Sequence, residues 1–367
     1  MGFLIDVTKY NMTSIPTLTP RESGKLISKN AQHIKICDEG VRKCAQEVIE
    51  RIHCGKIQLL NHCKKDIIYP QMPNEDGVDW IFFLDALNFS FWNFSNDNNS
   101  QYLVTYKDVG YSGLLGFVAA VCRTLDSGVA LTSPTFYRTI SEEQLNLYLM
   151  GDNGIPCPLI KERVECLHEI GNILNQKYQN SFVNCIKQCE PYGVNKAQNL
   201  LKLIRDEFPC FRDEENMTLK DQRSIVTVSF LKRAQILIAD LWSLFEGKGL
   251  GKFEDIESLT MFADYRVPQS LQYFGVFQYS EELLNALNKP GQIMEHGSLF
   301  EIEIRGCSIE AVDRIVKQTK MIMNQEKSEL TNYVTDMVID YFLWTFRREK
   351  RKEMEKFPYH KVRSVYY

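Results

Sequence analysis

The sequence predicts a mainly α-helical protein with a minor β element, folded as a single domain. Two capping boxes indicate helix starts: Thr19-Pro20-Arg21-Glu22 places proline at the first helical position, and Gln144 follows Ser141 at the capping-box spacing. The segment 102–106 (YLVTY) is the clearest strand pattern, because aromatic and β-branched residues dominate it. We expect this strand to pair with a neighbouring segment in a small sheet.

Apolar residues recur at helical spacing through most of the remaining chain, without a fixed repeat or a long linker. Between residues 57 and 79, Pro70, Pro73 and Gly77 interrupt the pattern and predict a connection. We expect helices at 20–31, 38–53, 111–126, 141–150, 158–178, 181–189, 195–208, 228–246, 254–262, 268–275, 280–288, 309–325 and 329–350.

The composition is that of an ordinary globular protein. Of the 367 residues, 44% are hydrophobic and 25% are charged, which allows a sizeable core. The net charge of −4 gives no general attraction for nucleic acid or an anionic membrane. The longest apolar run, 80–92, carries Asp85 and Asn88 and is too short to span a bilayer. Because no signal-peptide pattern is present, we expect a cytoplasmic protein.

The cysteine pattern argues against both disulfides and a metal centre. The eleven cysteines are an odd number with irregular spacing and no CxxC pair, so reduced and mostly buried thiols fit best. The repeated pattern His53-Cys54 and His62-Cys63 is the one candidate for metal binding. A helix end and a loop are the favoured alternative, because no other spacing typical of zinc ligands accompanies it. We therefore expect neither a metal nor a cofactor.

The most informative stretch is 252–269 (KFEDIESLTMFADYRVPQ). Asp264 lies between an apolar run and the pair Tyr265-Arg266, and Pro268 predicts the first turn of the next helix. Asp264 is therefore expected at or just before a helix N-terminus, where unpaired N–H groups stabilise an ionised carboxylate. An ionised carboxylate among apolar and aromatic walls can face a developing cation, which is the chemistry of glycosidic bond cleavage.

Other carboxylates interrupt apolar surfaces. Asp340 lies on a predicted helix face that is expected to pack inward, together with Tyr333, Met337 and Trp344. Asp336 precedes Asp340 by one helical turn, so both carboxylates can point into one pocket.

Asp85, within WIFFLDALNFSFW, and Asp240, within ILIADLW, are similarly out of place. A buried carboxylate must be paired or hydrogen-bonded, or it takes up a proton. Each acid taken alone is more often a structural group that pairs with an arginine or caps the backbone. Several in one chain, without a metal pattern, favour a polar ligand pocket. A base with a guanine edge would suit such a pocket, because it presents adjacent N–H donors that a carboxylate accepts.

Aromatic and basic residues are further candidates for ligand contacts. Four aromatics could stack on a base, although a single aromatic on an apolar face is more often core: Phe89, Phe262, Tyr265 and Trp344. The candidate phosphate-binding residues are Lys232, Arg233, Lys248, Lys252, Arg266 and Arg305. The basic run 347–352 is interleaved with and followed by glutamates, which favours a solvated helix end over a nucleic-acid patch.

Several long segments occur in a recognisable order: WIFFLDALNFSFW, YSGLLGFVAAVCRTLD, KRAQILIADLWSLFEGKGLGKFEDIESLTMFADYRVPQ, EIEIRGCS and DYFLW. Together they resemble the queuosine salvage proteins, a family of queuosine 5′-phosphate N-glycosylase/hydrolases. The resemblance runs from about Pro20 to Tyr367 and includes the tyrosine-rich end HKVRSVYY. It implies one domain at 19–367, preceded by an N-terminal extension at 1–18.

The resemblance implies hydrolysis of queuosine 5′-monophosphate to queuine and ribose 5-phosphate, so that the base can be reused for tRNA modification. It also implies a fold similar to the helix-hairpin-helix DNA glycosylases, in which a glycine-rich hairpin precedes an aspartate at a helix start. The turn 247–251 followed by Asp264 resembles that pair. The nucleophilic lysine of bifunctional DNA glycosylases has no secure counterpart, since Lys248 and Lys252 are near but unmatched. Hydrolysis by water is therefore favoured over an imine intermediate.

The residues and the resemblance agree on Asp264 as the catalytic carboxylate, which would stabilise an oxocarbenium-like ribosyl cation. We expect Asp336 and Asp340 to bind the base or its cationic cyclopentenyl amine, and Phe262 to stack on the base. The expected substrate site is completed by Asn88, Phe89, Lys232, Asp240, Tyr265 and Arg266. The expected partner is a small-molecule nucleotide, without direct contact to nucleic acid or membrane. The alternative is a non-enzymatic nucleic-acid-binding module on a glycosylase-like fold, which the net charge of −4 argues against.

Overall fold

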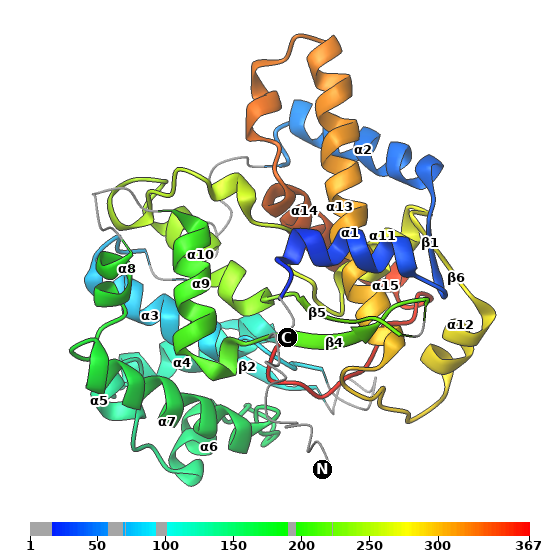
Figure 1. The fold of residues 1–367 in the computed structure, drawn as a ribbon. Coiled ribbons are helices and arrows are strands. Elements are labelled where there is room, and N and C mark those ends of the chain that lie inside the picture. The colour runs from blue at the N-terminus through cyan, green and yellow to red at the C-terminus, as the bar shows by residue number, and fades with distance from the viewer. Residues whose placement is uncertain (1–16, 58–68, 70, 93–100, 190–195, 222) are drawn as a thin grey trace, which may run out of the picture.

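The computed structural model of the protein describes residues 17–57, 69, 71–92, 101–189, 196–221 and 223–367 (Figure 1). Helices dominate this part of the chain and the strands are short, as the sequence predicts. The helices are α1 (Pro20–Asn30), α2 (Asp38–His53), α3 (Glu75–Ala86), α4 (Leu114–Asp126), α5 (Pro134–Tyr137), α6 (Glu142–Leu149), α7 (Ile160–Lys177), α8 (Val183–Gln188), α9 (Ala197–Glu207), α10 (Lys232–Leu244), α11 (Val267–Tyr273), α12 (Glu281–Asn288), α13 (Leu299–Gln325), α14 (Asp336–Glu349) and α15 (Arg351–Met354). The strands are β1 (Ile34–Ile36), β2 (Leu103–Tyr106), β3 (Val109–Ser112), β4 (Glu214–Thr218), β5 (Ile225–Ser229) and β6 (Phe277–Tyr279). Short 3₁₀ turns are η2 (Pro209–Phe211), η3 (Gly249–Gly251), η4 (Ile256–Ser258) and η5 (Glu329–Tyr333).

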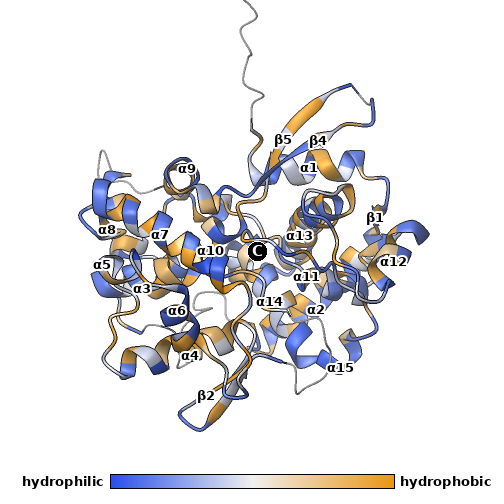
Figure 2. Ribbon diagram, turned by 90° about the horizontal axis from the view of Figure 1, so that it is seen from below, coloured by the Kyte–Doolittle hydropathy of each residue, from blue (hydrophilic) through white to orange (hydrophobic). Residues whose placement is uncertain are grey.

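The helices pack into two groups around separate hydrophobic clusters. The first cluster is built mainly from α3 to α10, and the second mainly from α1, α2 and α11 to α15. Figures 1 and 2 show the two groups side by side, with the C-terminal end of the chain between them. This arrangement leaves an interface in the middle of the molecule to which both groups contribute side chains.

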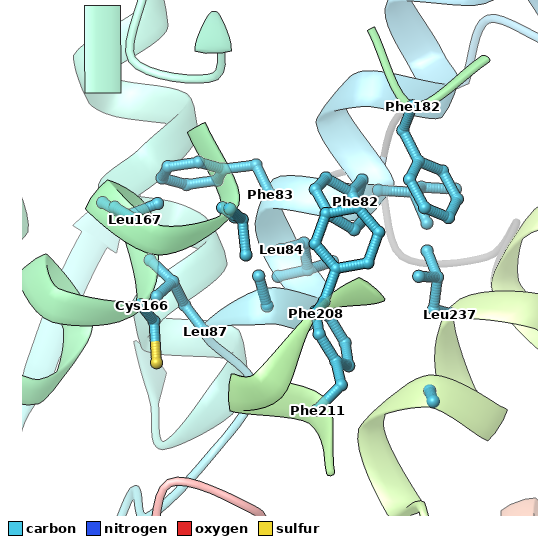
Figure 3. Close-up of a cluster of buried hydrophobic side chains, with 14 of the residues drawn as sticks. Phe82, Phe83, Leu84, Leu87, Cys166, Leu167, Phe182, Phe208, Phe211 and Leu237 are labelled. Atoms are coloured by element: carbon cyan, nitrogen blue, oxygen red, sulfur yellow. The ribbon is translucent and has the colours of Figure 1, made fainter. Parts of the chain in front are cut away.

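Aromatic contacts organise the first cluster (Figure 3). Phe82 of α3 stacks on Phe182 with ring centroids 4.1 Å apart. Phe208 and Phe211, which follow α9, approach the same ring with centroids at 5.2 and 5.9 Å. Such aromatic pairs contribute about 0.5–1.5 kcal/mol beyond the apolar area that they bury.

Helix α13 is the centre of the second cluster, where it contacts α1, α2 and α14. It meets α1 at two glycines. A Cβ atom added at Gly306 would lie 2.4 Å from Ile27 Cδ1, and one added at Gly24 would lie 2.7 Å from Ile309 Cγ2. The absence of a side chain at both positions therefore allows the two helix backbones to approach closely.

The strands form three antiparallel pairs, β1 with β6, β2 with β3, and β4 with β5. The β2–β3 hairpin confirms the expectation that the 102–106 strand pairs with a neighbouring segment, with Val104 opposite Tyr111. In the β1–β6 pair, Ile34 lies opposite Tyr279, which joins an early and a late part of the chain. Thr17 forms a bridge with Thr227 of β5, so the last residues of the predicted extension 1–18 pack on the domain.

Local capping signals located several helices correctly. Thr19 and Glu22 form the expected capping box at the start of α1, and Ser141 and Gln144 form the one at the start of α6. Helix α2 has the predicted bounds. Pro268 lies in the first turn of α11, as predicted.

Other element predictions are wrong. The predicted connection 57–79 includes the start of α3, whose residues are buried on nearly every side and so lack the amphipathic period of a surface helix. Residues 254–262 contain the short turn η4 rather than a helix. Part of the predicted helix 228–246 is strand β5, and α10 starts after it. Among the described residues, no helix is both long and apolar enough to cross a membrane.

Candidate active site

A cavity of about 1530 Å³ lies between the two helix groups. The first group contributes the segment after α3, the start of α4 and one face of α10. The second group contributes the segment before α11, the inward face of α14 and the segment 286–300. Cavities of this kind are the usual binding places for small molecules. The sequence-predicted residues that line it are Asn88, Phe89, Lys232, Asp240, Phe262, Asp264, Tyr265, Arg266, Asp340 and Trp344.

Asp264 lies directly before α11, which confirms the predicted position at a helix start. Its Oδ1 accepts hydrogen bonds from the backbone N–H groups of Arg266 and Val267, the latter at 3.1 Å. These donors belong to the set that a helix start leaves unpaired, and they stabilise negative charge on the carboxylate. The side chain is half-buried and lines the cavity.

A buried ion pair holds the segment that carries Asp264. Arg305 of α13 donates to both carboxylate oxygens of Asp213, at 2.8 and 2.6 Å, and to the carbonyl oxygen of Ala263 at 3.0 Å. Asp213 also accepts the backbone N–H of Lys232 at 3.1 Å. Arg305 is fully buried and does not line the cavity, so it links the start of α10 to the Asp264 segment and is not a phosphate-binding residue.

Asp340 lies on the face of α14 that lines the cavity. Its Oδ1 accepts the backbone N–H of Phe262 at 3.1 Å. Burial, and after it the charge of Asp264, raise the pKa of Asp340 well above the usual range of an aspartate. Asp340 therefore binds a proton more tightly than an ordinary aspartate does. Two carboxyl groups in such different surroundings can have different roles, one carrying a proton and the other stabilising positive charge.

Lys232, at the start of α10, brings a positive charge to the same region. Its ammonium donates to the carbonyl oxygen of Asn88 at 3.3 Å. Burial lowers the pKa of Lys232, and the charge of Asp264 is the largest opposing influence. The ammonium and the carboxylate therefore lie close enough to interact electrostatically within the cavity.

Asp336 does not reach the cavity, so the prediction that both α14 acids share one pocket is wrong. Arg21 of α1 donates to both carboxylate oxygens of Asp336, each at 3.3 Å, and to Asp313 at 2.8 Å. The alternative of a structural acid paired with an arginine applies to Asp336. Tyr333 also leaves the predicted inward face, because it lies in η5 before α14 and is exposed.

Asp85 and Asp240 have different environments. Asp85 is fully buried and lies outside the cavity lining; Asn88 donates to its Oδ1 at 3.3 Å, and its Oδ2 has no hydrogen-bond partner in the described part of the chain. Burial, and after it the charge of Asp240, raise the pKa of Asp85 well above the usual range. Asp85 therefore favours its protonated form and lies away from the cavity, whereas Asp240 lines the cavity and stays a candidate for ligand contact.

The four aromatic residues predicted to stack on a base all line the cavity, but their side chains differ in solvent exposure. Phe89 is fully buried, and the guanidinium groups of Arg163 and Arg233 lie 4.3 and 5.2 Å from its ring centroid. These contacts make Phe89 a packing residue of the wall. Phe262 is only half-buried and is the better candidate for a ring that meets a ligand.

Of the six predicted phosphate-binding residues, only Lys232 and Arg266 line the cavity. Arg233 is fully buried and donates to two backbone carbonyl groups. Lys248 lies 3.9 Å from Glu246 at the surface. The sequence shows that these positions are basic, but it does not determine where each side chain points.

The basic run 347–352 forms part of the cavity wall, which its sequence pattern did not predict. Its helical spacing could have indicated it, because Arg347 follows Asp340 by two turns and therefore shares its face. The tyrosine-rich C-terminal segment also contributes, and the hydroxyl of Tyr367 donates to Glu301 at 2.6 Å. The residues of the run that line the cavity are Arg347, Arg348, Glu349, Arg351 and Lys352.

In the described part of the chain, no group of three histidine, cysteine, aspartate or glutamate residues is arranged to hold a metal ion. His53 lies 3.6 Å from Glu326, and Cys54 is exposed. His62 and Cys63 lie outside the described residues.

A large cavity with two unlike carboxyl groups, aromatic walls and a basic rim defines a protein that binds a small polar molecule. The chain belongs to the queuosine salvage protein family, whose family model matches residues 68–367. It is similar to proteins named queuosine 5′-phosphate N-glycosylase/hydrolase. The one from Bos taurus is 39% identical over 350 residues, which cover 95% of this chain and 99% of the relative. The one from Schizosaccharomyces pombe is 33% identical over 365 residues, with 94% and 99% covered. The one from Sphaerobacter thermophilus is 31% identical over 290 residues, with 79% and 81% covered.

Proposed function

We propose that this protein hydrolyses the N-glycosidic bond of queuosine 5′-phosphate and releases queuine and ribose 5-phosphate. The names of the relatives support this activity, and the match covers nearly the whole length of both the chain and the Bos taurus relative. The observation that supports the proposal most directly is Asp264, a carboxylate held by two backbone N–H groups at the wall of a large cavity. Such a carboxylate can stabilise positive charge on the ribose as its bond to the base breaks.

In this proposal, Asp264 stabilises the ribosyl cation and orients the attacking water. Its backbone donors are fixed at a helix start, so the carboxylate needs no rearrangement when charge develops. Lys232 donates to the carbonyl oxygen of Asn88 and balances part of the negative charge at the site. We assign Lys232 to substrate contact and not to imine formation, which leaves water as the nucleophile.

Asp340 is proposed to bind the base. Its raised pKa favours the protonated form, and adjacent N–H donors or a cationic amine of the base would favour the ionised form instead. Phe262, whose backbone N–H already bonds to Asp340, is placed to bring its ring against the base. Asn88 and Asp240 line the part of the cavity that the first helix group contributes and are proposed to complete the base site.

We also propose that residues 19–367 form one catalytic domain related to the helix-hairpin-helix DNA glycosylases. Two features support the relation. Gly247 and Gly249 have positive φ angles in the turn that precedes the Asp264 segment, and Asp264 itself lies at a helix start. Packing of α1 and α2 against α13 supports a domain that begins before the family match at residue 68.

The test compares queuosine 5′-phosphate, queuosine and queuosine-containing tRNA under one set of conditions, with release of queuine as the readout. We expect the highest kcat/KM for the free 5′-monophosphate, because its phosphate is a charged handle remote from the reacting bond. Equal or better rates with the nucleoside would contradict the role of the phosphate. Release of base from intact tRNA, or tight binding of tRNA or duplex DNA in a gel-shift assay, would favour the nucleic-acid-binding alternative.

A further inference from the structure

Two arginines at the cavity wall converge on one neutral acceptor. Arg266 Nη1 and Arg347 Nε donate to the same side-chain oxygen, Oε1 of Gln269, at 3.2 and 3.3 Å. Within the described part of the chain, neither guanidinium lies within ion-pair distance of a carboxylate. Two positive charges are therefore held together without a counterion, which is unfavourable unless an anion joins them.

Two of the acidic residues near this end of α14 are engaged elsewhere. Glu349 accepts from Arg51 of α2 at 2.8 Å, and Glu353 accepts from Lys350 at 3.0 Å. Burial, and after it the charges of Arg266 and Arg351, lower the pKa of Arg347 to about 10. The lowered pKa of Arg347 agrees with the geometry, because burial and nearby positive charges both disfavour a charged guanidinium.

The convergence is built into the fold. Gln269 is almost fully buried, and its Nε2 donates to the backbone carbonyl oxygens of Met354 at 3.1 Å and Phe357 at 2.6 Å. These two acceptors fix the amide orientation, so Oε1 must point toward the arginines. The guanidinium of Arg266 also lies 3.9 Å from the ring centroid of Tyr359. This cation–π contact restrains the orientation of the guanidinium group.

The arginine pair lies at a suitable distance from the reacting groups. Arg266, Gln269 and Arg347 line the same cavity as Asp264 and Asp340. Arg347 follows Asp340 by two turns of α14, which is about 10 Å along the helix axis. That separation is comparable with the extent of a nucleoside monophosphate from its base to its phosphorus atom.

Building on the proposed function, we propose that Arg266 and Arg347 form the subsite for the 5′-phosphate of the substrate, a phosphate monoester. Two guanidinium groups can each donate paired hydrogen bonds to phosphate oxygens, and the negative charge of the phosphate removes their mutual repulsion. Arg351 and Lys352 also line the cavity and extend the positive field at the rim of this subsite.

The test measures kcat/KM for queuosine 5′-phosphate and for queuosine in the parent, Arg347→Gln and Arg347→Lys proteins. Loss of charge-assisted hydrogen bonds should lower kcat/KM for the phosphorylated substrate roughly ten- to hundredfold, mainly through KM, in Arg347→Gln. The value for the nucleoside should change less than threefold. Arg347→Lys should recover part of the loss, because it keeps the charge without the paired donors. Arg42→Gln, at an exposed position of α2, is the matched control.

Inhibition by the two products separates this inference from the proposed function. Ribose 5-phosphate should inhibit or bind Arg347→Gln at least tenfold more weakly than the parent, whereas queuine should bind both equally. An equal loss of kcat/KM for both substrates, or unchanged binding of ribose 5-phosphate, would overturn the subsite. If the parent releases no queuine, the proposed function fails. Calorimetry with ribose 5-phosphate and inorganic phosphate then still decides whether the arginines bind a phosphate.

Discussion

At the scale of single residues, the same side-chain type has different roles because its immediate surroundings differ. Asp264 accepts hydrogen bonds from two backbone N–H groups at a helix start and lines the cavity. Asp340 is more deeply buried, accepts one such hydrogen bond and interacts with the charge of Asp264, so its pKa is raised well above the usual range. Asp85 is enclosed in the first hydrophobic cluster, away from the cavity. Burial and the nearest charges therefore decide which acid can take part in chemistry.

Asp264→Asn should lower kcat for queuine release by about 10²–10³-fold or more while queuine binding stays measurable. The substitution removes the charge but keeps the size, so the loss should fall on the transition state and not on the ground state. Single-turnover kinetics together with calorimetry of queuine binding measure the two effects. A variant whose turnover stays within tenfold of the parent would show that Asp264 is not the catalytic group.

Asp85→Asn should change how stability depends on pH. A carboxyl group whose pKa is higher in the folded state takes up a proton on folding. Its contribution is fully present below the unfolded pKa of about 3.9 and is lost as pH rises through the folded pKa. Asparagine resembles the protonated acid and does not titrate. The free energy of unfolding of the variant, relative to the parent, should therefore increase as pH rises from about 4 toward the folded pKa of Asp85. Urea denaturation measures this difference, and a constant difference across that range would contradict the assignment.

At the scale of elements, α14 carries the chemistry of one cavity wall. Asp340, Trp344 and Arg347 share its inward face, so the helix presents a carboxyl group, an aromatic ring and a cation in sequence along the cavity. Asp336 lies in its first turn but is held by Arg21 of α1. The position of a residue around the helix, and not its distance in sequence from Asp340, therefore decides whether it meets a ligand.

The two acids of α14 should respond oppositely to substitution. Asp340→Asn keeps an acceptor for the N–H of Phe262 but cannot ionise when the base binds, so queuine affinity should fall roughly tenfold or more with little loss of stability. Asp340→Ala should lower both affinity and stability, because it also leaves that N–H unpaired.

Asp336→Asn is the matched comparison. It should cost about 1–2 kcal/mol of stability by weakening the pairing with Arg21, with queuine affinity unchanged. Calorimetry and thermal unfolding of the three variants measure both quantities. Unchanged queuine affinity in Asp340→Asn would leave Asp340 as a structural acid.

At the scale of the whole molecule, the cavity depends on both helix groups. The first group supplies Asn88, Lys232 and Asp240, and the second supplies Asp264 and Asp340. The buried pair of Arg305 and Asp213 connects them, because it bonds to the backbone of both the Lys232 and the Asp264 segments. A ligand in the cavity should therefore stabilise the molecule as a unit.

Queuine should raise the thermal unfolding temperature of the parent and of Asp264→Asn by similar amounts. At a free concentration of about 100 Kd, binding to the folded state alone adds about 2.7 kcal/mol of stability. Scanning calorimetry at several queuine concentrations measures the shift. Two separate transitions, of which only one moves with queuine, would show that the site belongs to a single helix group.

The sequence by itself determined the features that depend on a few neighbouring residues. The capping box of Thr19 and Glu22, the bounds of α2, and the placement of Asp264 before a helix opened by Pro268 all follow from interactions within one helical turn. The segments that resemble queuosine salvage proteins likewise identified the family that the comparisons confirm. Both kinds of signal lie in the order of the residues along the chain and do not depend on tertiary packing.

Only the tertiary structure decided which of these residues meet in one cavity. Asp336 and Asp340 look equivalent in sequence, but Arg21 from a distant helix holds one of them away from the cavity. Arg347 looks like part of a solvated helix end, but α14 packs so that this arginine lines the cavity beside Arg266. The physical reason is that burial, charge pairing and solvent access depend on contacts between segments far apart in the chain, which local patterns do not encode.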